Sequence, residues 1–167
     1  MNTADAVPLY NLAPAFRLMA LGLVLAAGPL AWVWLRNRQR PLAQRLAALT
    51  ALTLFLTFDL VMFGAFTRLT DSGLGCPDWP GCYGTSNPLA AHADIRMAES
   101  AMPTGPVTVA KAWIEMIHRY LAMSVGFLIL VLAVVSTWQK IKGHVVEKDA
   151  WQVRPFWAWL TLVWVCM

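Results

Sequence analysis

The sequence predicts an all-α, polytopic membrane helix bundle. Of its 167 residues, 59% are hydrophobic and only 13% are charged, which leaves too little polar surface for a soluble domain of this length. Apolar runs of about 20 residues, the length that crosses a bilayer as a helix, recur along the chain. Basic residues gather in the short connections between these runs, as membrane topology requires. The net charge of +4 therefore indicates orientation in a membrane, and we expect no nucleic-acid partner.

The first two apolar runs set the orientation. The run 18–35 is followed by the basic stretch 36–40 and by Arg45, with no acidic residue among them. Such a connection stays in the cytoplasm, so the N-terminus is predicted to lie outside. The second run, 46–66, then leads back to the outside, which in a bacterium is the periplasm.

The stretch 67–112 is predicted to be an external loop, because it has no excess of basic over acidic side chains. Within it, Asn87-Pro88 is typical of a helix start and 103–106, with two prolines and a glycine, of a helix stop. We therefore expect a short helix over the mouth of the bundle. The third run, 113–138, has tryptophan at both ends and returns to the cytoplasm.

A fourth apolar run, 156–167, follows Pro155 and a basic connection. About a dozen residues at 1.5 Å each cannot cross roughly 30 Å of hydrocarbon. The sequence therefore reads as truncated, and residues 1–167 are expected to form a single membrane domain that belongs to a longer bundle.

Two cysteines stand in the external loop. Cys76 and Cys82 flank five residues in GCPDWPGC, in a compartment where disulfides persist. A disulfide that closes a small loop is the simpler interpretation. A redox-active pair is the alternative, since a short exposed ring rich in Pro and Gly is more easily reduced than a buried one. Cys166, inside the fourth run, is typical of a packed thiol.

The third run begins with ionisable residues. Glu115 and His118, at i and i+3, project from one face, with Arg119 beside them. Ionisable groups inside a spanning helix are costly, which favours a function. An imidazole in a bundle can be the axial ligand of a haem iron, and Arg119 and Arg68 can pair with haem propionates. The simpler alternatives are a packed histidine and arginines that snorkel to the headgroups.

Three further polar residues carry weaker signals. Asp59 lies nominally at mid-membrane, where it must face the bundle interior, be protonated or find a partner, and a structural hydrogen bond is preferred to a proton path. His92 and His144 read as solvated loop residues.

Two long motifs, TRLTDSGLGCPDWPGC at 67–82 and KAWIEMIHRYLA at 111–122, resemble the haem A synthase family, the membrane enzymes that finish haem A for cytochrome oxidase. The resemblance covers about 46–138. The extra helix before it is similar to a variant found in some proteobacterial members. The family has two similar four-helix halves, and the resemblance implies that this chain is the N-terminal, substrate-side half.

The resemblance implies the oxidation of the C8 methyl group of haem O to a formyl group. It implies His118 as a ligand facing the haem iron, Glu115 as the catalytic carboxylate, and Cys76 with Cys82 as the external pair. It also implies a resident haem b and a second histidine ligand beyond Met167, and a place in the bacterial inner membrane. Haem O synthase and oxidase assembly factors are the implied protein partners. The 167 residues alone are expected to be inactive.

Two other functions stay open at this point. A membrane thiol–disulfide oxidoreductase that passes electrons to quinone explains Cys76 and Cys82 but gives no task to Glu115 and His118. A non-catalytic haem carrier or assembly subunit of the oxidase explains the histidine without any chemistry.

Overall fold

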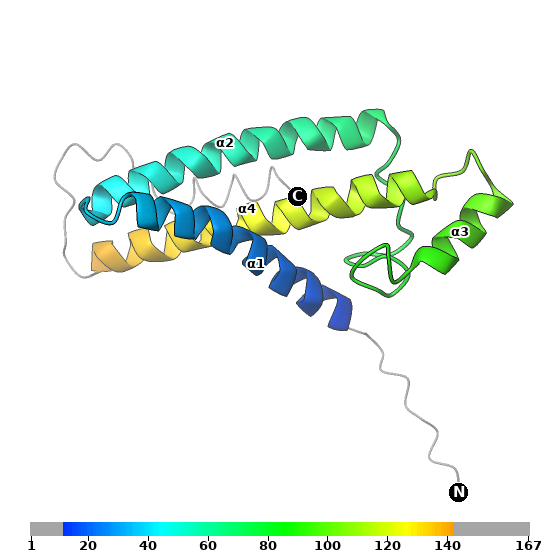
Figure 1. Ribbon diagram of the computed structural model, residues 1–167, viewed down its shortest axis with the longest axis horizontal. Coiled ribbons are helices and arrows are strands. Elements are labelled where there is room, and N and C mark those ends of the chain that lie inside the picture. Colours follow the sequence, from blue (N-terminus) through cyan, green and yellow to red (C-terminus); the bar gives the residue numbers. More distant parts are fainter. Residues whose placement is uncertain (1–11, 142–167) are drawn as a thin grey trace, which may run out of the picture.

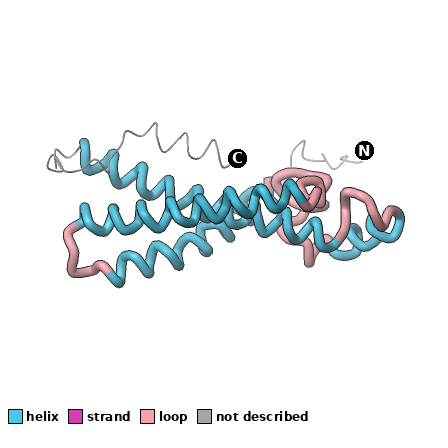
Figure 2. The backbone as a smooth tube through the Cα atoms, turned by 90° about the horizontal axis from the view of Figure 1, so that it is seen from above, coloured by secondary structure: helices cyan, strands magenta, loops and turns pink. Residues whose placement is uncertain are grey.

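The computed structural model describes residues 12–141, which form four helices (Figure 1). The long helices α1 (Ala13–Arg36), α2 (Leu42–Leu69) and α4 (Val109–Ile141) lie side by side, and α2 runs antiparallel to the other two. The short α3 (His92–Ala101) and the long loop before it lie together at one end, and the α1–α2 connection lies at the other (Figure 2). The loop therefore sits over one mouth of a three-helix bundle.

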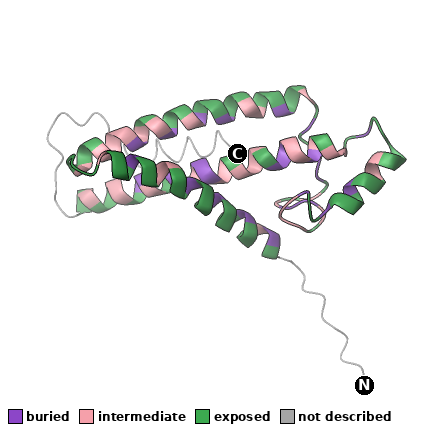
Figure 3. Cartoon of the chain, in the orientation of Figure 1, coloured by how far each residue is buried: buried purple, intermediate pink, exposed green. Residues whose placement is uncertain are grey.

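The three long helices are each long and apolar enough to cross a membrane. Exposed residues run along the outer faces of all three (Figure 3), and they include large apolar side chains such as Phe16, Phe55 and Leu130. A surface of this kind is suited to lipid, because helices satisfy their backbone hydrogen bonds internally and need no water. The predicted all-α membrane bundle is confirmed.

Each of the first three predicted apolar runs lies inside an observed helix that extends further at both ends. The reason is that the residues flanking each apolar stretch continue its helical backbone hydrogen bonds. The run 18–35 lies in α1, 46–66 in α2 and 113–138 in α4. The fourth run, 156–167, lies outside the described residues, as do His144 and Cys166.

The short helix of the external loop starts later than the Asn87-Pro88 signal predicts. The side-chain oxygen of Asn87 accepts a hydrogen bond from the backbone N–H of Ala90 at 2.9 Å, so it closes a turn. The helix itself begins at His92, where the N–H of Ile95 reaches the carbonyl of Ala91 at 3.0 Å. The predicted end holds, since α3 stops at Ala101, just before the Pro/Gly segment.

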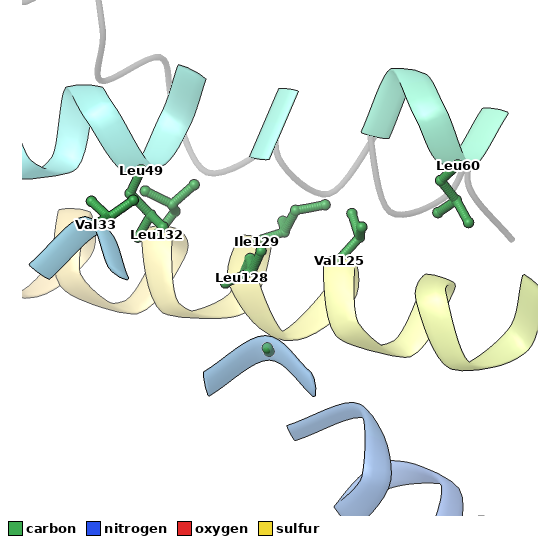
Figure 4. Close-up of a cluster of buried hydrophobic side chains, with 8 residues drawn as sticks. Val33, Leu49, Leu60, Val125, Leu128, Ile129 and Leu132 are labelled. Carbon is green, nitrogen blue, oxygen red and sulfur yellow. The ribbon is translucent and has the colours of Figure 1, made fainter. Parts of the chain in front are cut away.

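An apolar core joins the three long helices (Figure 4). Its buried members come from facing stripes of α1, α2 and α4, with α4 contributing half of them. They are Ala26, Val33, Leu49, Leu60, Val125, Leu128, Ile129 and Leu132. A second buried cluster lies under the loop and combines both loop cysteines with Leu18, Ala91, Ile95, Ala112 and Met116. The two clusters make α4 the central helix of the structure.

The contact between α1 and α4 depends on a glycine. A Cβ atom at Gly22 would lie 2.6 Å from the Cβ of Met123 and 3.4 Å from the backbone nitrogen of Ser124. No real Cβ is accommodated at that distance without a shift of one helix. Gly22 therefore sets how closely α1 approaches α4.

We expect Gly22→Ala to lower the thermal unfolding midpoint of the purified protein in detergent, since overpacking costs about 1–3 kcal/mol. Gly126→Ala is the control: it adds the same methyl group inside another spanning helix, α4, where no atom of the described residues lies within 4 Å. Both changes replace a glycine inside a helix by alanine, so the difference between them reports the α1–α4 contact. A midpoint for Gly22→Ala equal to that of Gly126→Ala would contradict the close approach.

Candidate functional site

A buried ion pair stands at the loop end of α4. Arg119 donates from Nη2 to Oε1 of Glu115, one helical turn before it, and the two side chains are only 15% and 9% exposed. Because charges removed from water are costly, such a pair persists only where further hydrogen bonds satisfy both partners. The sequence spacing brings the two residues to one face of α4, and the loop supplies those further bonds.

The loop wraps around this pair. Nη1 of Arg119 donates to the carbonyl oxygens of Asp78 at 3.1 Å and Pro80 at 3.2 Å, and also to that of Gly81. The second oxygen of Glu115 accepts the backbone N–H of Cys76 at 2.8 Å. One guanidinium and one carboxylate on α4 thus hold the backbone of a loop that lies about forty positions earlier in the sequence.

The loop is also closed within itself. Cys76 and Cys82 form a disulfide, and Cys82 exchanges backbone hydrogen bonds with Thr85 at 2.8 and 3.0 Å. The carboxylate of Asp78 accepts the backbone N–H groups of Tyr83 and Gly84. The disulfide predicted from the two cysteines is therefore present.

The alternative of a redox-active pair assumed that the ring is exposed, but the disulfide is buried. Cys76 is 5% exposed and Cys82 is 0% exposed, and both belong to the second buried cluster together with Met116 and Ala112. A thiolate of a redox partner must reach a sulfur atom in line to exchange with it. The burial favours a structural staple.

Glycine lets the loop approach α4 closely. A Cβ atom at Gly75 would lie 2.5 Å from the carbonyl carbon of Lys111, at the start of α4. Beyond this contact, the phenol of Tyr120 donates to the carbonyl of Ser86 at 2.7 Å, and Lys111 pairs with Asp71 at 3.1 Å. The loop is thereby fixed to the first three turns of α4.

His118 occupies a notch in α2. Its ring stacks on Phe63 with a centroid distance of 6.1 Å and an interplanar angle of 18°. A Cβ atom at Gly64 would lie 2.9 Å from Nε2 of His118, so glycine makes room for the imidazole. The half-buried imidazole is carried by α4 but is therefore held in place by contacts with α2.

A cavity of about 550 Å³ runs along α4 beside His118. This volume lies in the range of small-molecule and cofactor sites, about 300–1,000 Å³. His118 and Arg119 line it at the loop end together with Trp79 and Pro80 of the loop. The rest of the wall is apolar and comes from α1 and from α4 beyond Arg119. The cavity thus has one polar end and one apolar end.

The structure brings only some of the predicted site residues together. His118 and Arg119 meet at the cavity wall, whereas Glu115 lies behind Arg119 and does not line the cavity. Arg68, exposed near the end of α2, is also absent from the wall. Asp59 is exposed on α2, so among the described residues it does not face the bundle interior.

Sequence reasoning missed part of the wall. Trp79 was read only as part of a loop, although its neighbours Asp78 and Pro80 both give their carbonyls to Arg119. Ala122 and Gly126 were not singled out from the sequence, yet both line the cavity. Their spacing of four and eight residues from His118 places them on its face of the helix, and this signal was available in the sequence.

The donor set suits haem better than a free metal ion. In the described part of the chain, no group of three or more His, Cys, Asp or Glu side chains converges as a metal site. A single imidazole on an apolar cavity wall can nevertheless ligate an iron whose other ligands come from a porphyrin.

The fold and site define a class: a membrane helix bundle with an imidazole-bearing cavity under a disulfide-closed loop. The family model COX15-CtaA, described as cytochrome oxidase assembly protein, matches residues 47–167. The chain belongs to this family, as the motifs predicted. Helix α1 lies outside the matched stretch.

Three curated relatives, all named heme A synthase, are similar in sequence to parts of the chain. The protein of Shewanella oneidensis is 45% identical over 86 residues, which are 52% of this chain and 26% of the relative. That of Sinorhizobium fredii is 36% identical over 87 residues (46% and 24%), and that of Allorhizobium ampelinum 30% over 126 residues (69% and 34%). The matches thus span between a quarter and a third of the length of these relatives. No solved structure matches the chain.

Arg119→Lys is expected to increase local opening of the loop 76–84 while the helical fold is kept. Lysine keeps a positive charge near Glu115, but its single ammonium cannot reach three carbonyls and a carboxylate at once. Hydrogen bonds to a charged group contribute about 1.5–3 kcal/mol each, so exchange of backbone amides in 76–84 should rise by at least roughly tenfold in hydrogen–deuterium exchange. Arg96→Lys, on the exposed face of α3, is the control. Unchanged exchange in 76–84 would show that the carbonyls do not depend on the guanidinium.

Proposed function

We propose that the protein containing this chain is a haem A synthase, which oxidises the C8 methyl group of haem O to a formyl group. The observation that carries the proposal is the cavity with His118 and Arg119 at its polar end, in a chain of the COX15-CtaA family. The names of the relatives support it. The activity belongs to the whole protein, since the matches span 24% to 34% of these relatives, and the 167 residues alone are proposed to be inactive.

The site residues take distinct parts in this proposal. His118 ligates the iron of the substrate haem, and its ring plane is kept by Phe63 and Gly64. Arg119 marks the end of the cavity toward which the propionates point, and Arg68, exposed near the end of α2 and outside the cavity wall, is proposed as a second cation for them. The apolar wall keeps bulk water from most of the macrocycle, which strengthens these charged contacts.

Glu115 acts through Arg119. Both of its oxygens are engaged, one by the guanidinium and the other by the N–H of Cys76. In this arrangement the carboxylate fixes a cation at the cavity wall and compensates its charge. The catalytic part predicted for Glu115 is therefore proposed here as a positioning role, by which it sets the electrostatic field at the reacting methyl group.

The chemistry of the reaction fits a largely apolar cavity with one charged end. Two successive oxidations at one carbon give an alcohol and then a hydrated aldehyde, which loses water to leave the formyl group. Each oxidation passes two electrons and two protons to an external electron acceptor and takes one oxygen atom from water. The macrocycle delocalises charge that develops on the methyl carbon, so the hard chemistry belongs to the haem and the protein supplies orientation and electrostatics.

The proposal extends to the longer protein that contains this chain. A resident haem b lies in a second half, outside the described residues. Haem O synthase and oxidase assembly factors are partners, and the protein spans the bacterial inner membrane with the N-terminus and the loop 67–112 in the periplasm. The buried disulfide argues against the alternative of thiol–disulfide exchange with quinone.

The test uses a host that makes haem O but no haem A, carrying the complete gene that contains this sequence. Haem extracted from its membranes should contain haem A or the alcohol intermediate, because the cavity holds haem O for oxidation. His118→Ala should abolish this product and change the haem absorption spectrum, whereas His92→Ala, on exposed α3, should do neither. If only haem O accumulates on a haem-loaded wild-type protein, a non-catalytic haem carrier replaces the synthase. Full conversion by His118→Ala with an unchanged spectrum would exclude the ligand role.

Glu115→Gln is expected to lower the yield of haem A by roughly 10²-fold while the haem content stays near that of the wild type. The amide oxygen still accepts the N–H of Cys76, so the loop keeps its position, but the negative charge beside Arg119 is gone. Product and haem content are measured on the same membranes, with Asp94→Asn on α3 as the control for loss of a carboxylate. An undiminished yield of haem A would remove Glu115 from the mechanism.

A further inference from the structure

We propose that the ion pair between Asp71 and Lys111 positions His118, because it fixes the register of α2 against α4 at which Gly64 faces the imidazole. Asp71 and Lys111 are thus positioning residues, since they act through another side chain. The inference rests on the proposed function for the part that His118 plays, whereas the register itself follows from contacts among the described residues.

Two of the contacts that join α2 and its C-terminal end to α4 are equally spaced along both segments. The first is at Gly64, where an added Cβ atom would lie 2.9 Å from Nε2 of His118. The second is the ion pair, with 3.1 Å between Nζ of Lys111 and Oδ2 of Asp71. Asp71 follows Gly64 by seven residues. Lys111 precedes His118 by the same number, and α2 runs antiparallel to α4 (Figure 1). Seven residues are about two helical turns, so both contacts belong to one antiparallel register.

Asp71 occupies a backbone position that glycine usually takes. Its φ is 53°, in the left-handed region, directly after the C-cap of α2. The N–H groups of Asp71 and Ser72 donate to the carbonyls of Arg68 and Thr67, at 3.1 and 2.9 Å. These two bonds form a Schellman motif, in which glycine is common at the left-handed position because it lacks a Cβ atom. An aspartate there indicates a task for the side chain, and its carboxylate accepts a hydrogen bond from Lys111.

Lys111 connects three segments at the start of α4. Its ammonium donates to Asp71 and also, at 3.3 Å, to the carbonyl of Gly105 in the segment after α3. Its backbone lies against the loop, since a Cβ atom at Gly75 would lie 2.5 Å from its carbonyl carbon. Because this backbone contact fixes where Lys111 lies, its ammonium sets where the end of α2 lies on α4.

The ion pair acts on position more than on stability. The side chain of Asp71 is 83% exposed, and an exposed ion pair shifts an equilibrium by about fivefold at most. The contact at His118 is more sensitive to register, because a helix turns by about 100° per residue and a slip of α2 would replace Gly64 by a residue with a Cβ atom. That atom would displace the imidazole from its stacking on Phe63. Loss of the ion pair should therefore change the orientation of one ring and leave the fold intact.

Three substitutions separate the carboxylate from the backbone. Asp71→Gly suits the left-handed backbone and removes the side chain, Asp71→Asn tolerates that backbone and removes only the charge, and Lys111→Arg keeps an ion pair. The complete protein is expressed in the host that makes haem O but no haem A. The readout is the ferric haem signal in electron paramagnetic resonance that His118→Ala removes, since its g-values depend on the orientation of the axial imidazole.

We expect Asp71→Gly and Asp71→Asn to shift or split this signal and to lower the yield of haem A by about two- to fivefold at unchanged haem content. The unfolding midpoint of Asp71→Gly should be no lower than that of the wild type, because glycine is favoured at this helix end. Lys111→Arg should keep the wild-type signal. Asp94→Asn, which removes an exposed carboxylate on α3, is the control and should also keep it.

Two results at Asp71 would overturn the positioning role. A wild-type signal and yield in Asp71→Gly would show that the ion pair is dispensable. Loss of haem content together with a lower unfolding midpoint in both Asp71 variants would show that the pair only supports the fold. If His118→Ala removes no haem signal, the ligand role in the proposed function fails and the positioning role fails with it. That failure is seen in a different variant and is therefore distinct from a failure at Asp71.

Discussion

The structure depends on one buried ion pair, Glu115 with Arg119, and on what the pair holds. A buried ion pair is weak evidence for stability, because desolvation of both charges offsets most of their attraction. Here the remaining hydrogen-bonding capacity goes to the backbone of residues 76–81. These bonds are directional and cannot be replaced by apolar packing. The pair therefore specifies where a loop without regular structure lies on a membrane helix, which hydrophobic burial alone would leave undetermined.

The same arrangement explains why the cavity has two chemically different ends. At the loop end, the carbonyls bound by Arg119 fix the backbone on both sides of Trp79, so that a side chain 69% exposed still lies at the cavity wall. Farther along, α4 contributes to the apolar core, and the small residues Ala122 and Gly126 line the cavity. The polar end, which is held by hydrogen bonds, and the apolar end, which is lined by small residues, together suit an amphipathic ligand that lies along the helix axis.

The spanning helices could be predicted from the sequence, whereas the contacts between the loop and α4 could not. The three spanning helices follow from hydropathy, because a chain in lipid has few alternatives to a helix. Spacing on one helix predicted Glu115 and His118 on one face, whereas the structure pairs Glu115 with Arg119 and places only His118 at the cavity wall. Hydropathy and spacing carry no information about contacts between α4 and a loop some forty residues earlier, so the carbonyl ligands of Arg119 and the burial of Cys82 came only from the structure. The exposure of Asp59 among the described residues likewise came only from the structure, since the direction in which a helix face points is set by its neighbours.

Helix α1 adds a feature that the family match does not contain. The match begins at residue 47, yet Leu18 and Met19 of α1 line the cavity, and α1 approaches α4 closely at Gly22. The wall that carries His118, Arg119, Ala122 and Gly126 lies wholly within the matched stretch. The cavity therefore combines residues from the part of the chain matched to the family, including His118 and Arg119, with residues of α1 from outside that part. Changes in α1 can reshape the cavity without touching the residues that carry its chemistry, because His118 and Arg119 belong to a different helix.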